Sequence, residues 1–139
     1  MFEGKSNQSN ANVIYSVVIP TGASTSTPLQ LTTGTADWDP AVSSDGTHIA
    51  FARNQQIYGT ENVAVVGIAG ESPSSPATIL TADNESWGPM YLGSKILYLS
   101  WRAEIIFDNI YLMNGDGSNV TRITNTPYET CFNLWEFQQ

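Results

Sequence analysis

The sequence predicts an all-β protein, and its composition gives the first reason. The chain of 139 residues is rich in Ser, Thr, Asn and Gly beside Ile, Val, Tyr, Phe and Trp, which are the residue types of turns and pleated strands. The strong helix formers Ala, Leu, Glu and Lys do not dominate. The length corresponds to one domain at most, with enough chain for a single hydrophobic core.

A repeat in the sequence is the second reason, and it predicts the architecture. The segments LTTGTADWDPAV (31–42) and LTADNESWGPMY (80–91) align without a gap, 49 residues apart. A third copy begins at Ile123-Thr124, 43 residues after Leu80-Thr81. These spacings are near the ~40–45 residues of a four-stranded β-propeller blade. The predicted fold is a partial β-propeller made of four-stranded antiparallel blades, with about two complete blades and flanking strands.

The predicted strands follow one another in the order that a blade requires. In the first unit they lie at 41–42, 48–53, 63–69 and 77–81, and in the second unit at 90–91, 95–101, 109–114 and 120–124. The tight links Ser44-Asp45-Gly46 and Asn114-Gly115-Asp116-Gly117 contain residues that tolerate positive φ, as hairpin turns require. Upstream, 13–19 and 29–32 match a third and a fourth strand, and downstream 132–135 match a first strand.

These matches divide the chain into two parts. We expect a disordered or poorly ordered N-terminal segment at 1–12 and a propeller repeat segment at 13–139. The repeat segment consists of a partial blade (13–32), two blades (33–81 and 82–124) and the first strand of a further blade (125–139).

Two stretches resemble the WD-like repeats of TolB-type six-bladed β-propellers. They read LTTGTADWDPAVSSDGTHIAFAR (31–53) and NIYLMNGDGSNVTRIT (109–124), and the resemblance covers about residues 13–135. The chain departs from the family pattern at Val42 and Tyr91, where Trp is usual, and at Ser44, where Pro is usual. The resemblance implies a non-catalytic binding or scaffold module that mediates protein–protein interaction. It also implies a periplasmic or extracellular location, although no signal peptide is visible.

The resemblance leaves two enzymatic alternatives open. The chain can be the propeller part of a prolyl-oligopeptidase-type serine peptidase, or of a polysaccharide-active propeller enzyme, with the catalytic residues outside this chain. The chain itself has no Gly-x-Ser-x-Gly elbow, and its single histidine, His48, follows an Asp-Gly turn at the start of a predicted strand. We therefore predict no catalytic residues and no cofactor in this chain.

Charge and hydropathy exclude further classes of function. The net charge is −8, and the five Lys and Arg residues are scattered, so the chain cannot form a basic patch for nucleic acid. The longest apolar stretch, 63–69, is far shorter than the ~20 residues of a membrane-spanning helix, which predicts no membrane insertion. One cysteine and one histidine are too few ligands for a Cys/His zinc site, and we predict no bound metal.

The loops that enter the predicted blades carry acidic residues and tryptophans at repeated positions, which places them on one rim of the propeller. Converging carboxylates there can bind a cation or a basic peptide, or they can simply cap turns on a solvated rim. The tryptophans either stack on a ligand or pack between blades. The candidate ligand-facing rim, for a protein or peptide partner, consists of Asp37, Trp38, Asp39, Asp83, Glu85, Trp87 and Glu129.

The predicted stack of sheets is incomplete, because propellers close with about four to eight blades. Either the sequence is a fragment of a longer propeller, or the chain forms a homo-oligomer through exposed blade edges, such as the edge at 132–137. Cys131 lies in one of the loops that enter a blade, has no partner thiol, and is expected to be an unmodified cysteine with a structural role or none.

Overall fold

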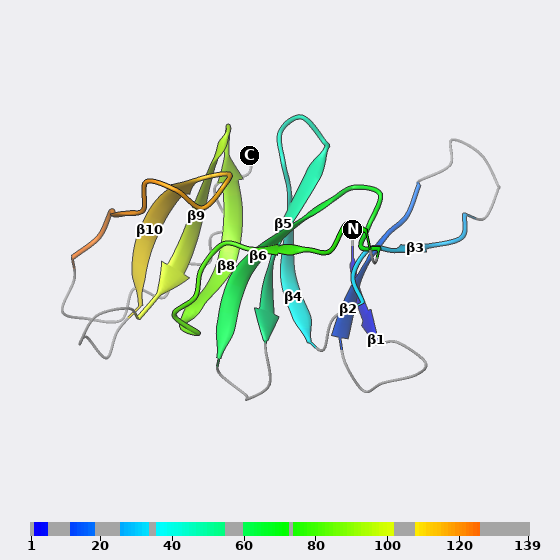
Figure 1. Cartoon of the computed structure of the whole chain (residues 1–139), viewed down its shortest axis with the longest axis horizontal. Helices are drawn as coiled ribbons and strands as arrows, with labels where there is room; N and C mark the ends of the chain where they lie inside the picture. Colours follow the sequence, from blue (N-terminus) through cyan, green and yellow to red (C-terminus); the bar gives the residue numbers. More distant parts are fainter. Residues whose placement is uncertain are drawn as a thin grey trace.

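The computed structural model describes residues 2–5, 12–18, 26–33, 36–54, 60–72, 74–101 and 108–125. Across these ranges every regular element is a β-strand (Figure 1). The predicted all-β fold class is confirmed. In this part of the chain we find no helix with the length and apolarity of a membrane span.

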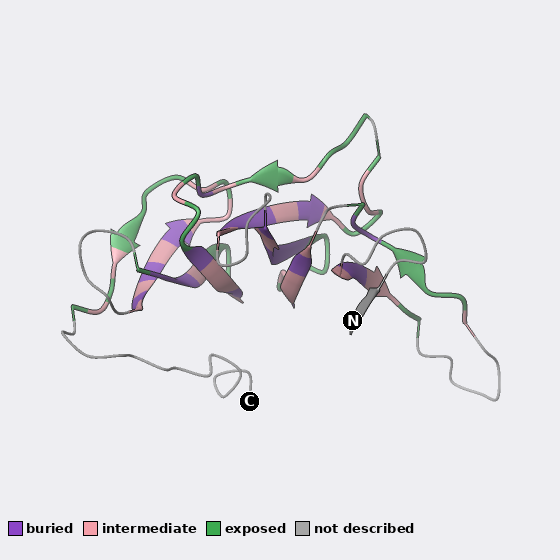
Figure 2. Ribbon diagram, turned by 90° about the horizontal axis from the view of Figure 1, so that it is seen from below, coloured by how far each residue is buried: buried purple, intermediate pink, exposed green. Residues whose placement is uncertain are grey.

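The strands form three antiparallel sheets, each in chain order. The first sheet contains β1 (Phe2–Lys5), β2 (Asn12–Ser16) and β3 (Leu29–Gln30). The second contains β4 (Asp37–Val42), β5 (His48–Asn54), β6 (Glu61–Gly67) and β7 (Thr78–Ile79). The third contains β8 (Ser86–Leu92), β9 (Lys95–Ser100), β10 (Asn109–Asn114) and β11 (Thr121–Arg122). Figure 2 shows them side by side in an open arc, with the short strands β3, β7 and β11 along its outside. The two four-stranded sheets confirm the predicted blades.

Within the N-terminal segment 1–12, strand β1 is an element that the sequence patterns did not indicate. Its residues Phe2–Lys5 pair with Tyr15–Asn12 of β2, because the backbone groups at the edge of β2 form hydrogen bonds to a neighbouring strand whatever side chains that strand carries. Since β2 and β3 match the third and fourth strands of a blade, β1 takes the place of the second. Residues 126–139, which include Glu129, Cys131 and most of the predicted further blade, lie outside the described residues.

The innermost strands β4 and β8 begin earlier than the sequence predicts. Trp38 pairs with Ala52, Trp87 pairs with Leu99, and in each strand the register then shifts across a bulge. The bulge lets the strand continue through the Trp-x-Pro segment, because a proline has no N–H to donate to the ladder and is tolerated at bulges. The two tryptophans therefore occupy matching places in adjacent sheets, as predicted from the repeat.

The recurring Leu-Thr dipeptide connects the outer strand of each sheet to the strand before it. Each threonine Oγ1 accepts the backbone N–H of an apolar residue near the start of the strand that precedes the outer one, which is β2, β6 or β10. The pairs are Thr32 with Ile14 at 3.0 Å, Thr81 with Val63 at 2.9 Å, and Thr124 with Ile110 at 2.9 Å. The preceding Leu31, Leu80 and Ile123 donate their own N–H groups to the carbonyls of the same three residues. This contact gives the dipeptide a structural reason to recur.

The hydrophobic core lies between the sheets, because alternate side chains of a strand point to opposite faces. Between the first and second sheets, a cluster buries Ile14, Leu31, Ile49, Phe51, Ala64 and Val66. Between the second and third, another buries Ala50, Val63, Ile96, Tyr98, Tyr111 and Met113. Tyr98 and Tyr111 stack with ring centroids 5.6 Å apart. The sheets thus pack face to face, as blades do.

Two glycines bring the outer turns of one sheet close to the sheet before it. Gly70 and Gly117 have φ of 84° and 85°. A Cβ atom on Gly70 would lie 3.1 Å from the Leu31 Cα, and one on Gly117 would lie 3.2 Å from the Leu80 carbonyl oxygen. Each glycine therefore permits a close approach between neighbouring sheets at the Leu-Thr dipeptide.

Candidate functional site

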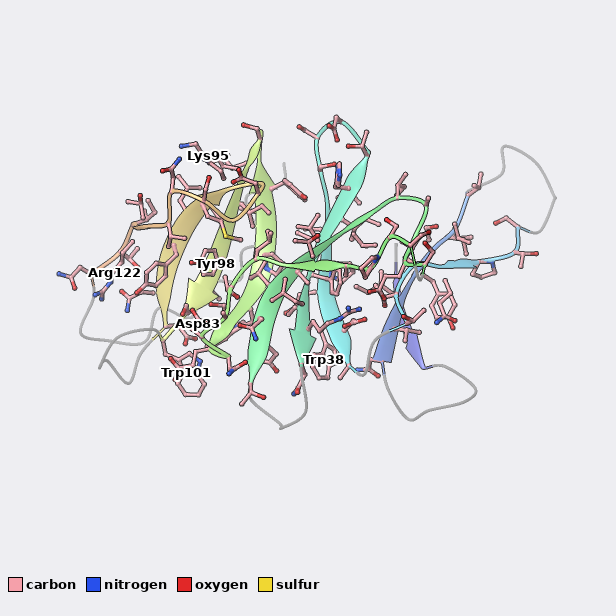
Figure 3. All side chains as sticks on the ribbon, in the orientation of Figure 1. Trp38, Asp83, Lys95, Tyr98, Trp101 and Arg122 are labelled. Atoms are coloured by element: carbon pink, nitrogen blue, oxygen red, sulfur yellow. The ribbon has the colours of Figure 1, made fainter. Side chains whose placement is uncertain are left out.

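The candidate rim lies at the end of the sheets where β4 and β8 begin. In Figure 3, Trp38, Asp83 and Trp101 lie at this end, whereas Lys95 lies at the opposite one. The hairpin turn with Asp45 and the turn with Asp116 are also at the opposite end, since His48 pairs with Gly67 and Lys95 with Asn114.

Asp37 does not face solvent. Its carboxylate is fully buried and accepts hydrogen bonds from Arg53, with Nε at 2.8 Å from Oδ1 and an Nη at 2.9 Å from Oδ2. The Arg53 guanidinium also bonds to Glu71 at 2.9 and 3.0 Å and lies 5.0 Å from the centroid of the Phe51 ring. These contacts make Asp37 part of a buried ion cluster, Arg53-Asp37-Glu71, and remove it from the predicted ligand-facing rim.

Glu71 connects this ion cluster to two neighbouring segments. Its carboxylate accepts the backbone N–H of Thr33 at 2.6 Å and that of Ala77 at 3.0 Å. Burial alone would raise the pKa of Glu71, but the hydrogen bonds from Arg53, Thr33 and Ala77 outweigh it and lower the pKa to about 2. The ionised carboxylate is therefore the form that the fold stabilises.

We expect acid to remove the contribution of Glu71 to stability. Its pKa falls from an ordinary 4.5 to about 2 on folding, so this contribution is fully present above about pH 4.5 and is lost as the pH falls through about 2. Urea unfolding of the wild type and Glu71→Gln between about pH 2 and 6 measures it. The variant should be less stable at the upper end, and the difference should shrink towards the lower end. Parallel stability curves would contradict this role.

Asp83 caps the turn that leads into β8. Its carboxylate accepts the backbone N–H of Glu85 at 3.1 Å and the Ser86 hydroxyl at 2.8 Å. Asn84 within this turn has a φ of 60° and accepts a hydrogen bond from the Asn62 side chain at 2.7 Å. Of the two roles considered for the acidic residues, binding a ligand or capping a turn, the contacts of Asp83 correspond to capping a turn.

Asp39 lies at the bulge of β4 in a backbone conformation that L-residues seldom adopt. Its φ is 51°, and the equivalent residue of β8 is Gly88, with a φ of 57°. The Asp39 carboxylate accepts a hydrogen bond from the Gly88 backbone, which joins the two inner strands. Burial nevertheless raises the pKa of Asp39. A non-glycine residue in this region stores backbone strain, which is often found at functional positions.

Glu61, which the sequence patterns did not single out, lies beside Asp39 and Glu85. The backbone of Glu61 forms an isolated parallel bridge with Glu85, and burial together with the charge of Asp39 raises the pKa of Glu61. No sequence pattern indicated this position, because the bridge to Glu85 joins two different sheets. Asp39, Glu61 and Glu85 form what we call the acidic rim.

Trp38 and Trp87 directly precede the two bulge residues Asp39 and Gly88 in strands β4 and β8. Trp38 and Trp87 are half-buried, and Trp87 packs against the cluster of Met90 and Leu99. The ring of Trp101, a residue absent from the predicted site, contacts Trp87 edge-on, with centroids 5.5 Å apart and planes at 88°. Trp101 is 40% exposed. Its place as the last residue of the predicted strand 95–101 was the available signal.

The described residues contain no group of three or more His, Cys, Asp or Glu side chains that could hold a metal ion. His48 bonds through its ring Nδ1 to the Thr47 hydroxyl at 2.7 Å, within the turn organised by Asp45. Hydrogen bonds from Ser43 and Thr47 lower the pKa of Asp45 to about 2. The histidine thus belongs to a hydrogen-bonded turn at the end of the sheets opposite the acidic rim.

Comparison with solved structures decides the architecture. A TolB-type protein from Agrobacterium tumefaciens superposes with a TM-score of 0.70 at 24% sequence identity, over 91% of this chain. The chain folds as a segment of a TolB-like β-propeller. TolB from Acinetobacter baumannii superposes with a TM-score of 0.57 at 19% identity, over 87% of this chain. The segment spans 42% and 28% of the lengths of these two proteins.

The sequence comparisons add no closer assignment. No family model matches the chain, and no curated protein matches it. At 24% and 19% identity the likeness to TolB concerns the fold, and a propeller fold supports many functions. Within this fold, Asp39 lies in the first strand of one sheet, and Glu85 directly precedes the first strand of the next.

Proposed function

We propose that this TolB-like segment is a non-catalytic binding module that recognises a protein or peptide partner at the acidic rim. The single observation that carries the proposal is the strained Asp39 beside Glu61. The fold holds both carboxylates where burial raises their pKa values, and Trp38 and Trp87 directly precede Asp39 and Gly88 in strands β4 and β8. A partner segment with basic and apolar side chains complements such a surface, through charge and through contact with the aromatic rings.

The fold does not need a carboxylate at position 39, which argues that Asp39 has a role other than stabilising the fold. Glycine occupies the equivalent position 88 with nearly the same φ, so the bulge does not require a carboxylate. Since burial raises the pKa of Asp39, ionisation of this carboxyl group costs more free energy in the folded chain than in the unfolded chain. A residue that costs folding free energy at a repeated position is a candidate for selection by binding.

Asp39→Gly tests the proposal. The variant removes the carboxylate and leaves a residue that adopts positive φ freely, so we expect its melting temperature to equal or exceed that of the wild type. A displayed library of random peptides is selected on the wild-type chain, and the dissociation constants of the enriched peptides are then measured on both proteins. We expect binding to weaken by about tenfold or more, since charge-assisted contacts contribute roughly 1.5–3 kcal/mol.

Asp116→Asn is the matched control. It removes one negative charge at the opposite end of the sheets, where Asp116 organises a turn through Ser118. Peptide affinity should be unchanged in this variant. Equal losses in Asp39→Gly and Asp116→Asn would mean that only the net charge matters, and no loss in Asp39→Gly would place the binding surface elsewhere. Either result contradicts a site at the acidic rim.

A further inference from the structure

The segment that leads from the second sheet to the third is fastened to the start of β6. This segment, residues 81–85, lies between the outer strand β7 and the inner strand β8, and we call it the crossover. The Asn62 side chain of β6 is 1% exposed. Its Oδ1 accepts the backbone N–H of Asn84 at 3.0 Å and the Thr81 hydroxyl at 3.2 Å, and its Nδ2 donates to the Asn84 Oδ1 at 2.7 Å. One buried amide therefore binds the crossover at two of its residues.

The backbone of Asn84 determines which way the Asn62 amide points. A backbone N–H can only donate, so the Asn62 atom that faces it is the oxygen, and the Asn62 nitrogen then faces the Asn84 side chain. Asn84 has a φ of 60°, a region that few residues other than Gly, Asn and Asp adopt. The two hydrogen bonds thus hold the crossover in a backbone conformation that most residues avoid.

The sheets themselves do not require an amide at this place. In each sheet the threonine of the Leu-Thr dipeptide binds one backbone N–H, and the residue directly before that N–H is Val13 in β2, Asn62 in β6 and Asn109 in β10. All three are 1% exposed, so this buried place accepts valine as well as asparagine. Asn109 accepts the Thr124 hydroxyl at 3.2 Å, as Asn62 accepts that of Thr81. The contacts with Asn84 therefore give Asn62 a role that the repeat does not demand.

The Asn62–Asn84 contacts lie directly beside the acidic rim. Glu61 precedes Asn62 in β6, Glu85 follows Asn84 in the crossover, and the backbones of the two glutamates form an isolated parallel bridge. Because this bridge is not part of a ladder, the adjacent hydrogen bonds of Asn62 are what fixes Glu85 against Glu61. The position of Glu85 in the rim therefore depends on a side chain that is itself buried.

We infer that Asn62 is a positioning residue for the acidic rim: by binding Asn84 it holds Glu85 in place beside Glu61 for a basic partner segment. The inference rests on the proposed function, since it concerns the same binding surface. It adds that the affinity of this surface depends on a buried amide that does not touch the partner.

Asn62→Val tests the inference, and Asn109→Val is its matched control. Both variants replace an amide that is 1% exposed by the residue that occupies the equivalent place in β2. Dissociation constants are measured for the peptides selected on the wild-type chain. We expect Asn62→Val to weaken binding about fivefold, the effect of roughly one hydrogen bond, and Asn109→Val to leave the affinity unchanged. Urea titration should show that both variants remain folded with reduced stability. Equal losses of affinity in the two variants would overturn the inference.

A double-mutant cycle with Glu85→Gln separates positioning from a general effect on the fold. Glu85→Gln removes the carboxylate that Asn62 is inferred to position, and it should itself weaken binding. If Asn62 acts through Glu85, adding Asn62→Val to Glu85→Gln should weaken binding no further, so the two effects are not additive. Fully additive effects would show that Asn62 does not act through Glu85 and would overturn the inference.

Asn84→Gly changes the other side of the contact with little risk to folding. Glycine adopts positive φ freely and keeps the backbone N–H that binds Asn62, but it lacks the side-chain oxygen that faces the Asn62 Nδ2. We expect binding to weaken about two- to threefold. Unchanged affinity in Asn84→Gly or Asn62→Val, while Asp39→Gly still weakens binding, would overturn this inference alone. Unchanged affinity in Asp39→Gly would overturn the proposed function together with it.

Discussion

Replacing Arg53 by methionine is expected to lower the free energy of unfolding by about 3–5 kcal/mol, the usual loss when one partner of a buried ion pair is removed. Methionine retains much of the side-chain length but leaves the Asp37 and Glu71 carboxylates without their cation. The Asp37 side chain is 0% exposed and that of Glu71 is 7% exposed, so water cannot readily replace the guanidinium. Urea unfolding followed by tryptophan fluorescence measures the loss.

Arg122→Met is the control for this change. The Arg122 Nε donates to the backbone carbonyl of Thr124 at 2.7 Å, so its removal leaves a carbonyl, and no carboxylate, without that donor. We expect a loss of about 1–2 kcal/mol for this variant. Equal losses for Arg53→Met and Arg122→Met would contradict the importance of the ion cluster.

Gly117→Ala is expected to lower the free energy of unfolding by about 2–3 kcal/mol, through strain at positive φ and crowding against the preceding sheet. The new Cβ would lie 3.2 Å from the Leu80 carbonyl oxygen and 3.3 Å from the Leu80 Cβ. Neither atom can move without shifting the backbone of the neighbouring outer strand. The same urea titration applies.

Gly46→Ala separates the two causes. Gly46 has a φ of 70°, and a Cβ there meets no atom within 4 Å, so only the backbone strain remains. We expect a loss of about 1 kcal/mol. The difference in unfolding free energy between Gly46→Ala and Gly117→Ala measures the cost of the close contact between sheets. Equal losses in the two variants would mean that the sheets do not approach each other at Leu80.

The sequence was sufficient to predict the blades because their determinants are local. The Leu-Thr dipeptide recurs because threonine binds the strand beside it, and the segments with the Asp-Gly and Asn-Gly turns connect antiparallel neighbours, β4 with β5 and β10 with β11. Strand β1 was missed because its pairing depends on backbone groups of β2, which leave no pattern in side chains. The early start of β4 and β8 was missed because a bulge accommodates Pro40 and Pro89 inside a strand.

The candidate site was only partly predictable. The repeat correctly placed Trp38 and Trp87 at equivalent positions, but it treated all acidic residues in the entering loops alike. Asp37 proved to be the partner of Arg53, which is 16 residues away along the chain, and a contact at that distance depends on strand register. Glu61 joined the acidic rim through a bridge to Glu85 in the next blade, which no local pattern encodes.

The packing of one sheet on the next is tested most directly by nuclear Overhauser effects in the isotopically labelled chain. The fold predicts cross-peaks between the Ile14 methyl groups and the Phe51 ring, and between the Ala50 methyl group and the Tyr98 ring, since each pair belongs to one buried cluster shared by two sheets. Cross-peaks within each sheet without any between these pairs would mean that the strands pair as described but do not stack as propeller blades.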